Sequence, residues 1–260
     1  MFNRDRNQVD RYQAPNAGQG GYAPWLNQNQ PAEAGTGGVA VAREGYLTMS
    51  FFWMFLALLV SAGAAAFVLS NQTALQFVVD NFFILIIAEL GLVFGISLGV
   101  NRIGAIPALG LLFVYALLNG ATISLVVLGS IARTGGASGV LTAFLGASAI
   151  FGAAAIYGVV TKRDLTRLGG LLFMGLIGLI VVSLLNAFIF QGTTLDLLIG
   201  VGGVVIFTGL TAYHVQQLNS GQLGGVQTRE GASVIGALLL YLNFVNLFLS
   251  LLRVFGGSRD

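Results

Sequence analysis

From Phe51 onward, long apolar stretches alternate with short polar breaks. Each stretch is about as long as the ~20 residues that an α-helix needs to cross the hydrocarbon core of a bilayer. A strand of a membrane barrel would be about half this length and would alternate apolar with polar residues. The pattern therefore predicts an all-α, polytopic transmembrane helical bundle of seven spans. The predicted spans are residues 51–69, 82–100, 104–130, 139–160, 169–190, 195–218 and 233–255.

Residues 1–50 differ from the rest in composition, because they are rich in Asn, Gln, Gly and Ala and contain three of the four prolines. A segment without apolar runs cannot bury enough surface to offset the entropy of ordering. It does not resemble a signal peptide either, since no apolar stretch follows Arg4 and Arg6. We predict a disordered, polar cytoplasmic tail over residues 1–50 and a seven-helix transmembrane domain over residues 51–257.

The overall composition supports a membrane protein. Hydrophobic residues make up 56% of the chain and charged residues 8%, whereas soluble domains carry about 25% charge. The absence of cysteine and the single histidine exclude thiolate and multi-histidine metal sites. A net charge of +2 without a long basic stretch gives no basis for nucleic-acid binding. The lipid bilayer is thus the predicted partner, and no cofactor is predicted.

The distribution of positive charge predicts the orientation. If the tail is cytoplasmic, nine of the twelve Lys and Arg residues lie on the cytoplasmic side, as expected from the positive-inside rule. The tail has a bacterial-looking composition, so we expect an integral protein of a bacterial cytoplasmic (inner) membrane. Seven full spans would leave the C-terminus outside. Charge alone leaves a second arrangement open, in which residues 233–255 form a re-entrant segment and the C-terminus returns inside.

Glycine has a regular spacing on the second predicted span. Gly91, Gly95 and Gly99 recur at every fourth position and therefore share one face of a helix. Small residues on one face allow the backbones of two transmembrane helices to approach closely. We therefore expect another helix to pack against this face.

Polar residues at bilayer depth are the candidate functional residues, because burying them in hydrocarbon is costly. Glu89 is the only carboxylate at bilayer depth, and Asn243 lies about as far from the cytoplasmic end of its span. His214 reaches a similar depth if its helix continues to about residues 221–223. We predict that these three residues meet and form an ion pathway or gate. No firm metal site is predicted, but Glu89 is a candidate ligand for a cation such as calcium or for a proton.

Three further residues are secondary polar candidates: Asn119, Asn246 and Arg102. For Asn119 and Asn246 the favoured interpretation is structural, namely that their side chains join neighbouring helices by hydrogen bonds.

Three segments carry a resemblance to a known family. Residues 236–248 (GALLLYLNFVNLF) resemble the signature helix of the Bax inhibitor family, also called the transmembrane Bax inhibitor motif or lifeguard family. Residues 212–216 (AYHVQ) are similar to its Tyr-Asp-x-Gln motif, and residues 87–91 (IAELG) to its glutamate-containing second helix. The resemblance implies seven helices around a central hydrophobic one. It also implies a calcium leak channel or a calcium-handling protein, with roles in stress and cell death in eukaryotic members.

The sequence departs from this family at two positions. The resemblance implies a pair of aspartates on the sixth and seventh helices that share a proton and sense pH, but His214 and Asn243 stand there. Two adjacent carboxylates raise each other's proton affinity, which a histidine and an asparagine do not do. Neither supplies the negative oxygen ligands that calcium prefers. We therefore expect altered pH sensing, with Glu89 as the anionic group of the pathway.

Two other functions remain open. One is a non-conducting membrane protein that regulates or binds a membrane protease or a stress or cell-death factor. The other, a more distant alternative, is an intramembrane serine protease, because residues 136–139 (GASG) resemble the serine motif of rhomboid proteases and His214 lies on the sixth span. A serine–histidine pair must lie within hydrogen-bonding distance, about 3 Å. The predicted topology instead places Ser138 near the outer surface and His214 towards the inner one, so we expect no enzyme.

Overall fold

The computed structural model describes residues 36–256 except 135, 222, 224–225 and 227. Every regular element among these residues is helical, and from Ala40 onward the helices belong to one compact unit. The elements in chain order are α1 (Thr36–Ser70), α2 (Gln72–Asp80), α3 (Phe82–Ile103), α4 (Ala105–Thr134), α5 (Ser138–Val160), α6 (Thr166–Leu185), η2 (Asn186–Phe190), α7 (Thr193–Ser220) and α8 (Arg229–Gly256).

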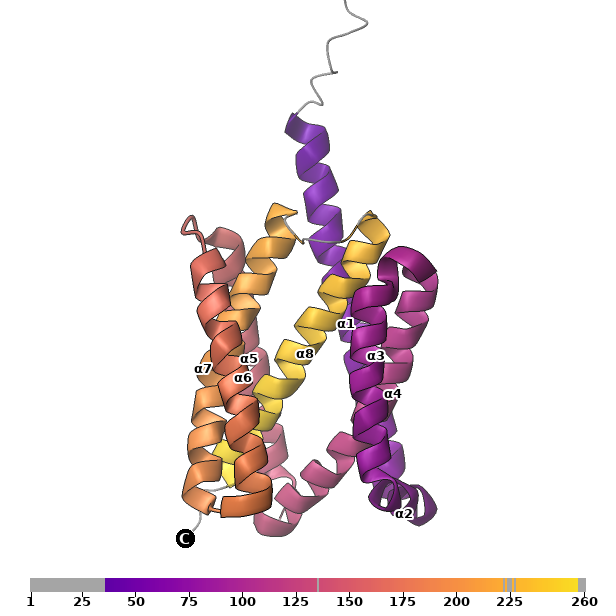
Figure 1. The fold of residues 1–260 in the computed structure, drawn as a ribbon, viewed down its shortest axis with the longest axis vertical. Helices are drawn as coiled ribbons and strands as arrows, with labels where there is room; N and C mark the ends of the chain where they lie inside the picture. The colour runs from indigo at the N-terminus through magenta and orange to yellow at the C-terminus, as the bar shows by residue number, and fades with distance from the viewer. Residues whose placement is uncertain (1–35, 135, 222, 224–225, 227, 257–260) are drawn as a thin grey trace, which may run out of the picture. The chain divides into compact units, whose positions relative to one another are not determined.

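Seven helices are long and apolar enough to span a bilayer, which confirms the predicted fold class. The spanning parts begin with Tyr46–Ser70 of α1 and end with α8. In Figure 1, α8 starts at the end of the bundle that holds the α3–α4 and α5–α6 turns and finishes at the opposite end. Its 28 residues correspond to about 42 Å of helix. The last helix is therefore long enough to cross a bilayer completely, and it runs from one end of the bundle to the other.

The first span starts earlier than the predicted boundary at residue 51. Helix α1 begins at Thr36, and the side chains of Tyr46 and Ser50 are buried. Ser50 lies against Gly236 of α8, so this part of the chain packs within the membrane domain although its composition is polar. The predicted tail up to residue 35 lies outside the described residues.

Helix α2 is an element that the apolar pattern did not predict. Its nine residues lie between two asparagines, and the Asn71 side chain accepts a hydrogen bond from the backbone N–H of Ala74. Asparagine is a favoured N-cap because its short side chain satisfies an unpaired N–H of the first turn. Phe77 and Val79 are exposed, and Figure 1 places α2 at the end of the bundle opposite the α3–α4 turn.

Helix α8 forms the centre of the bundle. In its most apolar stretch 72% of the residues are buried, whereas the corresponding value for α6 is 6%. In Figure 1, α8 crosses between α5, α6 and α7 on one side and α1, α3 and α4 on the other. A helix that is apolar on all sides is suited to such a central position. The resemblance to a family with a central hydrophobic helix thus predicted the architecture correctly.

The predicted packing of another helix against Gly91, Gly95 and Gly99 is wrong. Gly91 and Gly95 have open space where a Cβ atom would project, and Gly99 faces only Ile103 of its own helix. Close approaches occur at other glycines instead. A Cβ on Gly120 would overlap the backbone of Ser61, and one on Gly158 would lie 2.5 Å from the carbonyl oxygen of Ala212. Spacing alone could not distinguish a helix face that packs from one that faces lipid, because both are apolar.

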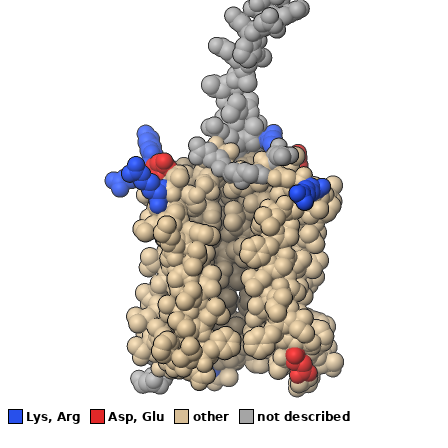
Figure 2. Space-filling model, in the orientation of Figure 1, with Lys and Arg blue, Asp and Glu red and all other residues tan. Residues whose placement is uncertain are grey.

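Positive charge gathers at one end of the bundle. Figure 2 displays most of its Lys and Arg side chains at the end that carries the α3–α4 and α5–α6 turns. This end includes Arg102 near the end of α3, and Lys162 and Arg163 between α5 and α6. At the other end, α4 and α8 finish with Arg133 and Arg253 in their last turns.

The close approach at Gly158 yields a prediction with a matched control. We expect Gly158→Ala to lower the free energy of unfolding by about 1–3 kcal/mol, because the added methyl group overpacks the α5–α7 contact. We expect Gly91→Ala to leave the free energy of unfolding unchanged or raise it by up to about 1 kcal/mol, since that position is open and alanine favours a helix more than glycine does. Thermal unfolding of both variants in detergent measures the difference. Equal midpoints would contradict the described packing of α5 on α7.

Candidate functional site

Glu89 lies on α3 and faces α4. Its Oε2 atom accepts a hydrogen bond of 2.9 Å from the side-chain amide of Asn119, and its Oε1 atom accepts one of 2.7 Å from the hydroxyl of Thr122. Asn119 and Thr122 are three residues apart on α4 and therefore lie on one face of that helix. Both carboxylate oxygens are thus satisfied by the protein, which lowers the cost of placing this group at bilayer depth.

The hydrogen bonds of Glu89 continue across the bundle. The hydroxyl of Tyr241 on α8 donates to the Oδ1 atom of Asn119 over 2.9 Å. The hydroxyl of Ser61 on α1 lies 2.6 Å from the Tyr241 oxygen and 2.7 Å from the carbonyl oxygen of Ala116. Four helices, α1, α3, α4 and α8, are joined in this way. Asn119 therefore has the structural contacts that its interpretation as a helix-joining residue requires.

His214 and Asn243 form a separate pair. The side-chain nitrogen of Asn243 on α8 lies 2.9 Å from the Nδ1 atom of His214 on α7. An amide nitrogen can only donate, so Nδ1 acts as the acceptor and a neutral ring carries its proton on Nε2. The pair joins α7 to α8 at the positions where the family resemblance implies two aspartates. Glu89 makes no hydrogen bond with it among the described residues.

The two groups meet at a cavity. Glu89, Asn119, His214 and Asn243 all line one cavity of about 570 Å³, together with apolar residues of α3, α6, α7 and α8. The three predicted residues therefore share one space, as expected, although they do not form one hydrogen-bonded cluster. Tyr115 also lines the cavity, and its ring meets that of Tyr241 edge to face, with centroids 5.5 Å apart.

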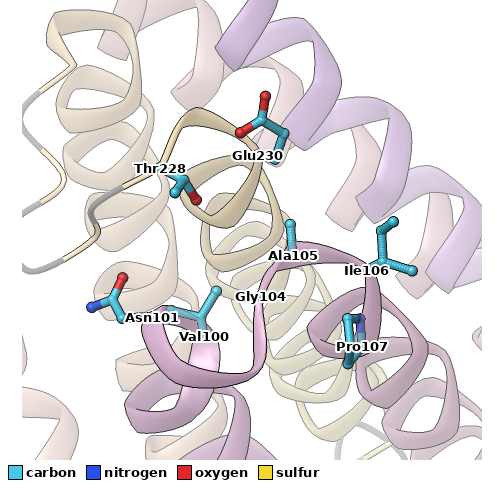
Figure 3. Close-up of a pocket in the computed structure, with 8 residues that line it drawn as sticks. All are labelled: Val100, Asn101, Gly104, Ala105, Ile106, Pro107, Thr228 and Glu230. Atoms are coloured by element: carbon cyan, nitrogen blue, oxygen red, sulfur yellow. The ribbon is translucent and has the colours of Figure 1, made fainter.

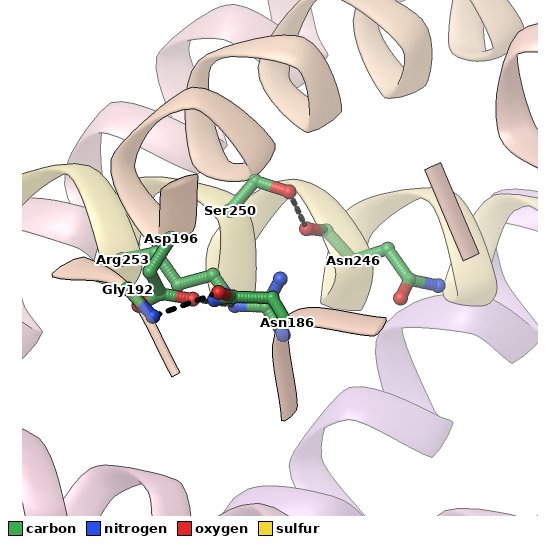
Figure 4. Close-up of polar contacts among 6 residues, drawn as sticks. All are labelled: Asn186, Gly192, Asp196, Asn246, Ser250 and Arg253. Carbon is green, nitrogen blue, oxygen red and sulfur yellow. Dashed lines mark hydrogen bonds and ion pairs between the residues drawn. The ribbon is translucent and has the colours of Figure 1, made fainter. Parts of the chain in front are cut away.

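The other two predicted polar residues have different positions. Asn246 lines the same cavity, but its side chain donates to the carbonyl oxygen of Leu242 on its own helix over 2.8 Å. The prediction that it joins two helices is therefore wrong. Figure 4 displays its place on α8, one turn before Ser250, whose hydroxyl donates to the Asn246 carbonyl over 2.7 Å. Arg102 is exposed in the last turn of α3 and does not line the cavity.

Polar contacts also lie where α6 and α7 are joined. The Oδ1 atom of buried Asn186 accepts a hydrogen bond of 3.0 Å from the backbone N–H of Gly192 (Figure 4). Arg253, which lines the cavity, lies 3.7 Å from Asp196 in the first turn of α7. These contacts hold the turn between η2 and α7 next to the last turn of α8.

Gln216 has a role that the sequence analysis missed. Its Oε1 atom accepts a hydrogen bond of 2.9 Å from the backbone N–H of Leu165, and its Nε2 atom donates to the carbonyl oxygen of Arg163 over 2.8 Å. One side chain thus fixes the α5–α6 turn to α7, two residues after His214. The polar position in residues 212–216 was recognised as part of a motif, but no local pattern indicates a partner some fifty residues away.

Ser138 and His214 are not brought together. Ser138 begins α5, whereas Gly158 near the other end of that helix contacts Ala212 and Val215, which flank His214. About 30 Å of helix separates Ser138 from Gly158. A serine nucleophile must lie within about 3 Å of its histidine base, so this pair lacks the geometry of a protease dyad. Within the described residues there is also no group of three metal-ligating His, Cys, Asp or Glu side chains.

A second, smaller cavity lies away from these residues. It has a volume of about 370 Å³ and is formed by the α3–α4 turn and the start of α8 (Figure 3). Glu230 lies at its edge together with Thr228, whose hydroxyl accepts a hydrogen bond of 3.1 Å from the backbone N–H of Gly231. Thr228 therefore caps the first turn of α8. Nothing in this second cavity matches the buried polar character of the first.

The fold and the site define a multi-pass helical membrane protein with a polar-lined cavity beside a buried central helix. Comparison with known sequences places it more closely. The sequence model described as "Inhibitor of apoptosis-promoting Bax1" matches residues 43–260. The chain therefore belongs to the Bax inhibitor family, as the resemblance of its polar segments predicted.

Similar proteins occur in several bacteria. The inner membrane protein YbhL of Escherichia coli K12 is 37% identical over 225 residues, covering 83% of this chain and 93% of that protein. An uncharacterized protein of Borreliella burgdorferi is 38% identical over 230 residues, with 84% and 94% covered. One of Deinococcus radiodurans is 37% identical over 218 residues, with 83% and 91% covered.

The hydrogen bonds of Tyr241 yield a second prediction. Tyr241→Phe leaves the buried Oδ1 atom of Asn119 without its donor, so we expect a loss of about 1–2 kcal/mol in the free energy of unfolding. Tyr115→Phe is the matched control, because the Tyr115 hydroxyl forms no hydrogen bond with the described residues although it lines the same cavity. Thermal unfolding in detergent compares the two. A larger loss for Tyr115→Phe would contradict the described network.

Proposed function

We propose that this protein is a pathway for the leak of cations across the membrane, or a regulator of such a leak, with calcium as the candidate ion. The observation that carries the proposal is that Glu89, His214 and Asn243 line one cavity at bilayer depth. An ionisable group in a transmembrane segment is costly and is a functional candidate for that reason. Family membership supports the proposal through the calcium leak that the family resemblance implies.

The ligands of the cavity favour passage of a cation over its retention. A calcium ion prefers six to eight oxygen ligands, including carboxylates. The cavity offers the Glu89 carboxylate and the amide oxygens of a few asparagines, and Asn119 already uses its oxygen to accept from Tyr241. A site with one charged ligand would attract a cation without holding it tightly, and this is the behaviour that a leak requires.

The His214–Asn243 pair gives the proposed pathway a different response to pH from that of an aspartate pair. Neutral His214 accepts from Asn243 through Nδ1. Protonation places a hydrogen on that nitrogen, so the Asn243 amide would have to turn over and present its oxygen. It also adds a positive charge to the cavity that contains Glu89. We therefore infer that protonation of His214 opposes cation passage by repulsion.

A second candidate function is a non-conducting regulator or binding partner of a membrane protein. Both oxygens of Glu89 already accept hydrogen bonds from Asn119 and Thr122. A carboxylate satisfied in this way can also serve to join α3 to α4. The two functions differ in one measurable respect, because only the leak pathway requires that Glu89 affect ion flux.

We further propose that the chain lies in a bacterial inner membrane with its N-terminus in the cytoplasm. The positive charge at the end with the α3–α4 and α5–α6 turns (Figure 2) supports this orientation through the positive-inside rule, and the E. coli relative is named as an inner membrane protein. Reporter fusions after Lys162 should report the cytoplasm, and fusions after Ser70 and Gln191 the outside. The reverse pattern would refute the orientation.

Ion flux in liposomes tests the leak directly. Purified protein is reconstituted with a calcium indicator or a pH indicator inside, and flux is measured across external pH. We expect Glu89→Gln to reduce calcium flux several-fold, because it removes the negative charge of the cavity. Glu230→Gln is the matched control, since it makes the same substitution at an exposed carboxylate outside this cavity (Figure 3).

A double substitution tests the His214–Asn243 pair. His214→Asp combined with Asn243→Asp introduces the aspartate pair that the family resemblance implies, and we expect it to increase calcium permeation. A folded double variant that conducts no better than the parent would show that these positions do not line the pathway. If neither the parent nor any variant moves calcium or protons, the regulator function replaces the leak.

A further inference from the structure

The cavity next to Glu89 is open towards lipid along one side. Several residues that line it on α3 and α6 are also exposed on the outside of the bundle. Leu90 on α3 is 55% exposed, and Phe173, Ile180 and Leu184 on α6 are 60%, 50% and 53% exposed. Helices α3 and α6 thus form the two rims of the cavity, and Figure 2 displays a hollow between the two halves of the bundle.

The surroundings of this opening are hydrocarbon. Both rims belong to helices that span the bilayer, and the rim residues named above are all apolar. Water at this opening lacks the two to four polar partners that it needs, because the rim residues are apolar. An empty space would forfeit the packing contacts of its lining. An acyl chain from the adjoining leaflet needs no polar partners and fills the space. It can enter because the cavity is continuous with the lipid-facing surface.

The lining of the cavity extends along α8. It runs from Asn243 through Asn246 and Leu249 to Arg253. Asn243 and Arg253 are ten residues apart on α8, which corresponds to about 15 Å. The stretch of the cavity from Asn243 to Arg253 is therefore long enough for most of an acyl chain and has a positive charge at the Arg253 end.

Arg253 is suited to the headgroup of such a lipid. Its side chain is 41% exposed, and its Nε atom lies 3.7 Å from the carboxylate of Asp196, a distance too long for a hydrogen bond. A guanidinium carries five N–H donors and matches phosphate geometry well. None of these donors makes a hydrogen bond with the described residues, so a phosphate can bind Arg253 alongside its ion pair with Asp196.

We propose that a membrane phospholipid occupies this cavity. One acyl chain is inserted between α3 and α6, on the side of Glu89 and His214 towards the C-terminal end of α8, and the phosphate is bound by Arg253. The chain fills the apolar part along Leu249 and separates the polar part from the outer side of the membrane. This proposal does not rest on the cation pathway, because a non-conducting protein would hold the lipid equally well. In a conducting protein, the same lipid would obstruct the pathway.

Spin labelling distinguishes lipid from water in the cavity, and the absence of native cysteines makes single labels straightforward. A nitroxide is attached at Leu249→Cys, with Leu98→Cys as the lipid-facing control, which is 78% exposed on α3, and Arg163→Cys as the exposed control in the α5–α6 turn. We expect the Leu249 label to collide with oxygen and with chain-labelled phospholipid, like the label at Leu98. Collision mainly with a water-soluble nickel chelate, as at Arg163, would overturn the proposal.

Lipid retention tests the headgroup contact. After extensive detergent exchange, native mass spectrometry should detect one phospholipid bound to the parent and to Arg133→Gln. Arg133 is the matched control because it also ends a helix on the side where Arg253 lies, but it does not line the cavity. We expect Arg253→Gln to reduce the lipid-bound fraction at least five-fold, and the cavity-filling Leu249→Trp to do the same. Equal retention in all four proteins would refute the site, even if the liposome assay demonstrates a calcium leak.

Discussion

A polar side chain at bilayer depth has no water with which to form hydrogen bonds, so its hydrogen-bond partners must come from the protein. At Tyr241 this constraint joins three helices, α1, α4 and α8. Its hydroxyl contacts Ser61 of α1 and Asn119 of α4, and Asn119 in turn donates to Glu89 of α3. Tyr241 itself is fully buried at the centre of the bundle on α8. The position of the candidate carboxylate therefore depends on the packing of the central helix.

The same helix divides the site into two groups. Two residues after Tyr241, Asn243 points to α7 and pairs with His214. One side of α8 thus fixes Glu89 to the α1–α3–α4 part of the bundle, and another fixes His214 within the α7–α8 pair. Both groups reach one cavity, so a small shift between the two parts would change the distance between the carboxylate and the imidazole.

Much of the fold was predictable because bilayer thickness sets the length of a spanning helix. The seven spans followed from the lengths of the apolar stretches, and Glu89, His214 and Asn243 were named as candidates from their depth, whereas Tyr115 and Arg253, which line the same cavity, were not. Packing was harder to predict, because lipid-facing and buried helix faces are equally apolar. The spacing of Gly91, Gly95 and Gly99 therefore suggested a contact that does not exist, whereas the isolated Gly158 makes one.

Hydrogen bonds between residues that are far apart in the sequence could not be predicted either. No local pattern connects Gln216 with the backbone of Arg163 and Leu165, or Tyr241 with Ser61. Asn246 illustrates the converse, because its amide appeared suited to join helices but donates to its own helix instead. Such pairings depend on how the helices are rotated against one another, and the lengths of the apolar stretches do not contain this information.

The most direct test of the central claim is whether Glu89 itself meets the cations that enter the cavity. Infrared difference spectra of the reconstituted protein, recorded with and without calcium, report the carboxylate vibrations that change on binding. The account predicts a carboxylate band that shifts with calcium and is absent in Glu89→Gln. The same band should be displaced in Asn119→Ala before calcium is added, because one of its hydrogen-bond donors is gone. Identical calcium-induced spectra for the parent and Glu89→Gln would contradict the claim.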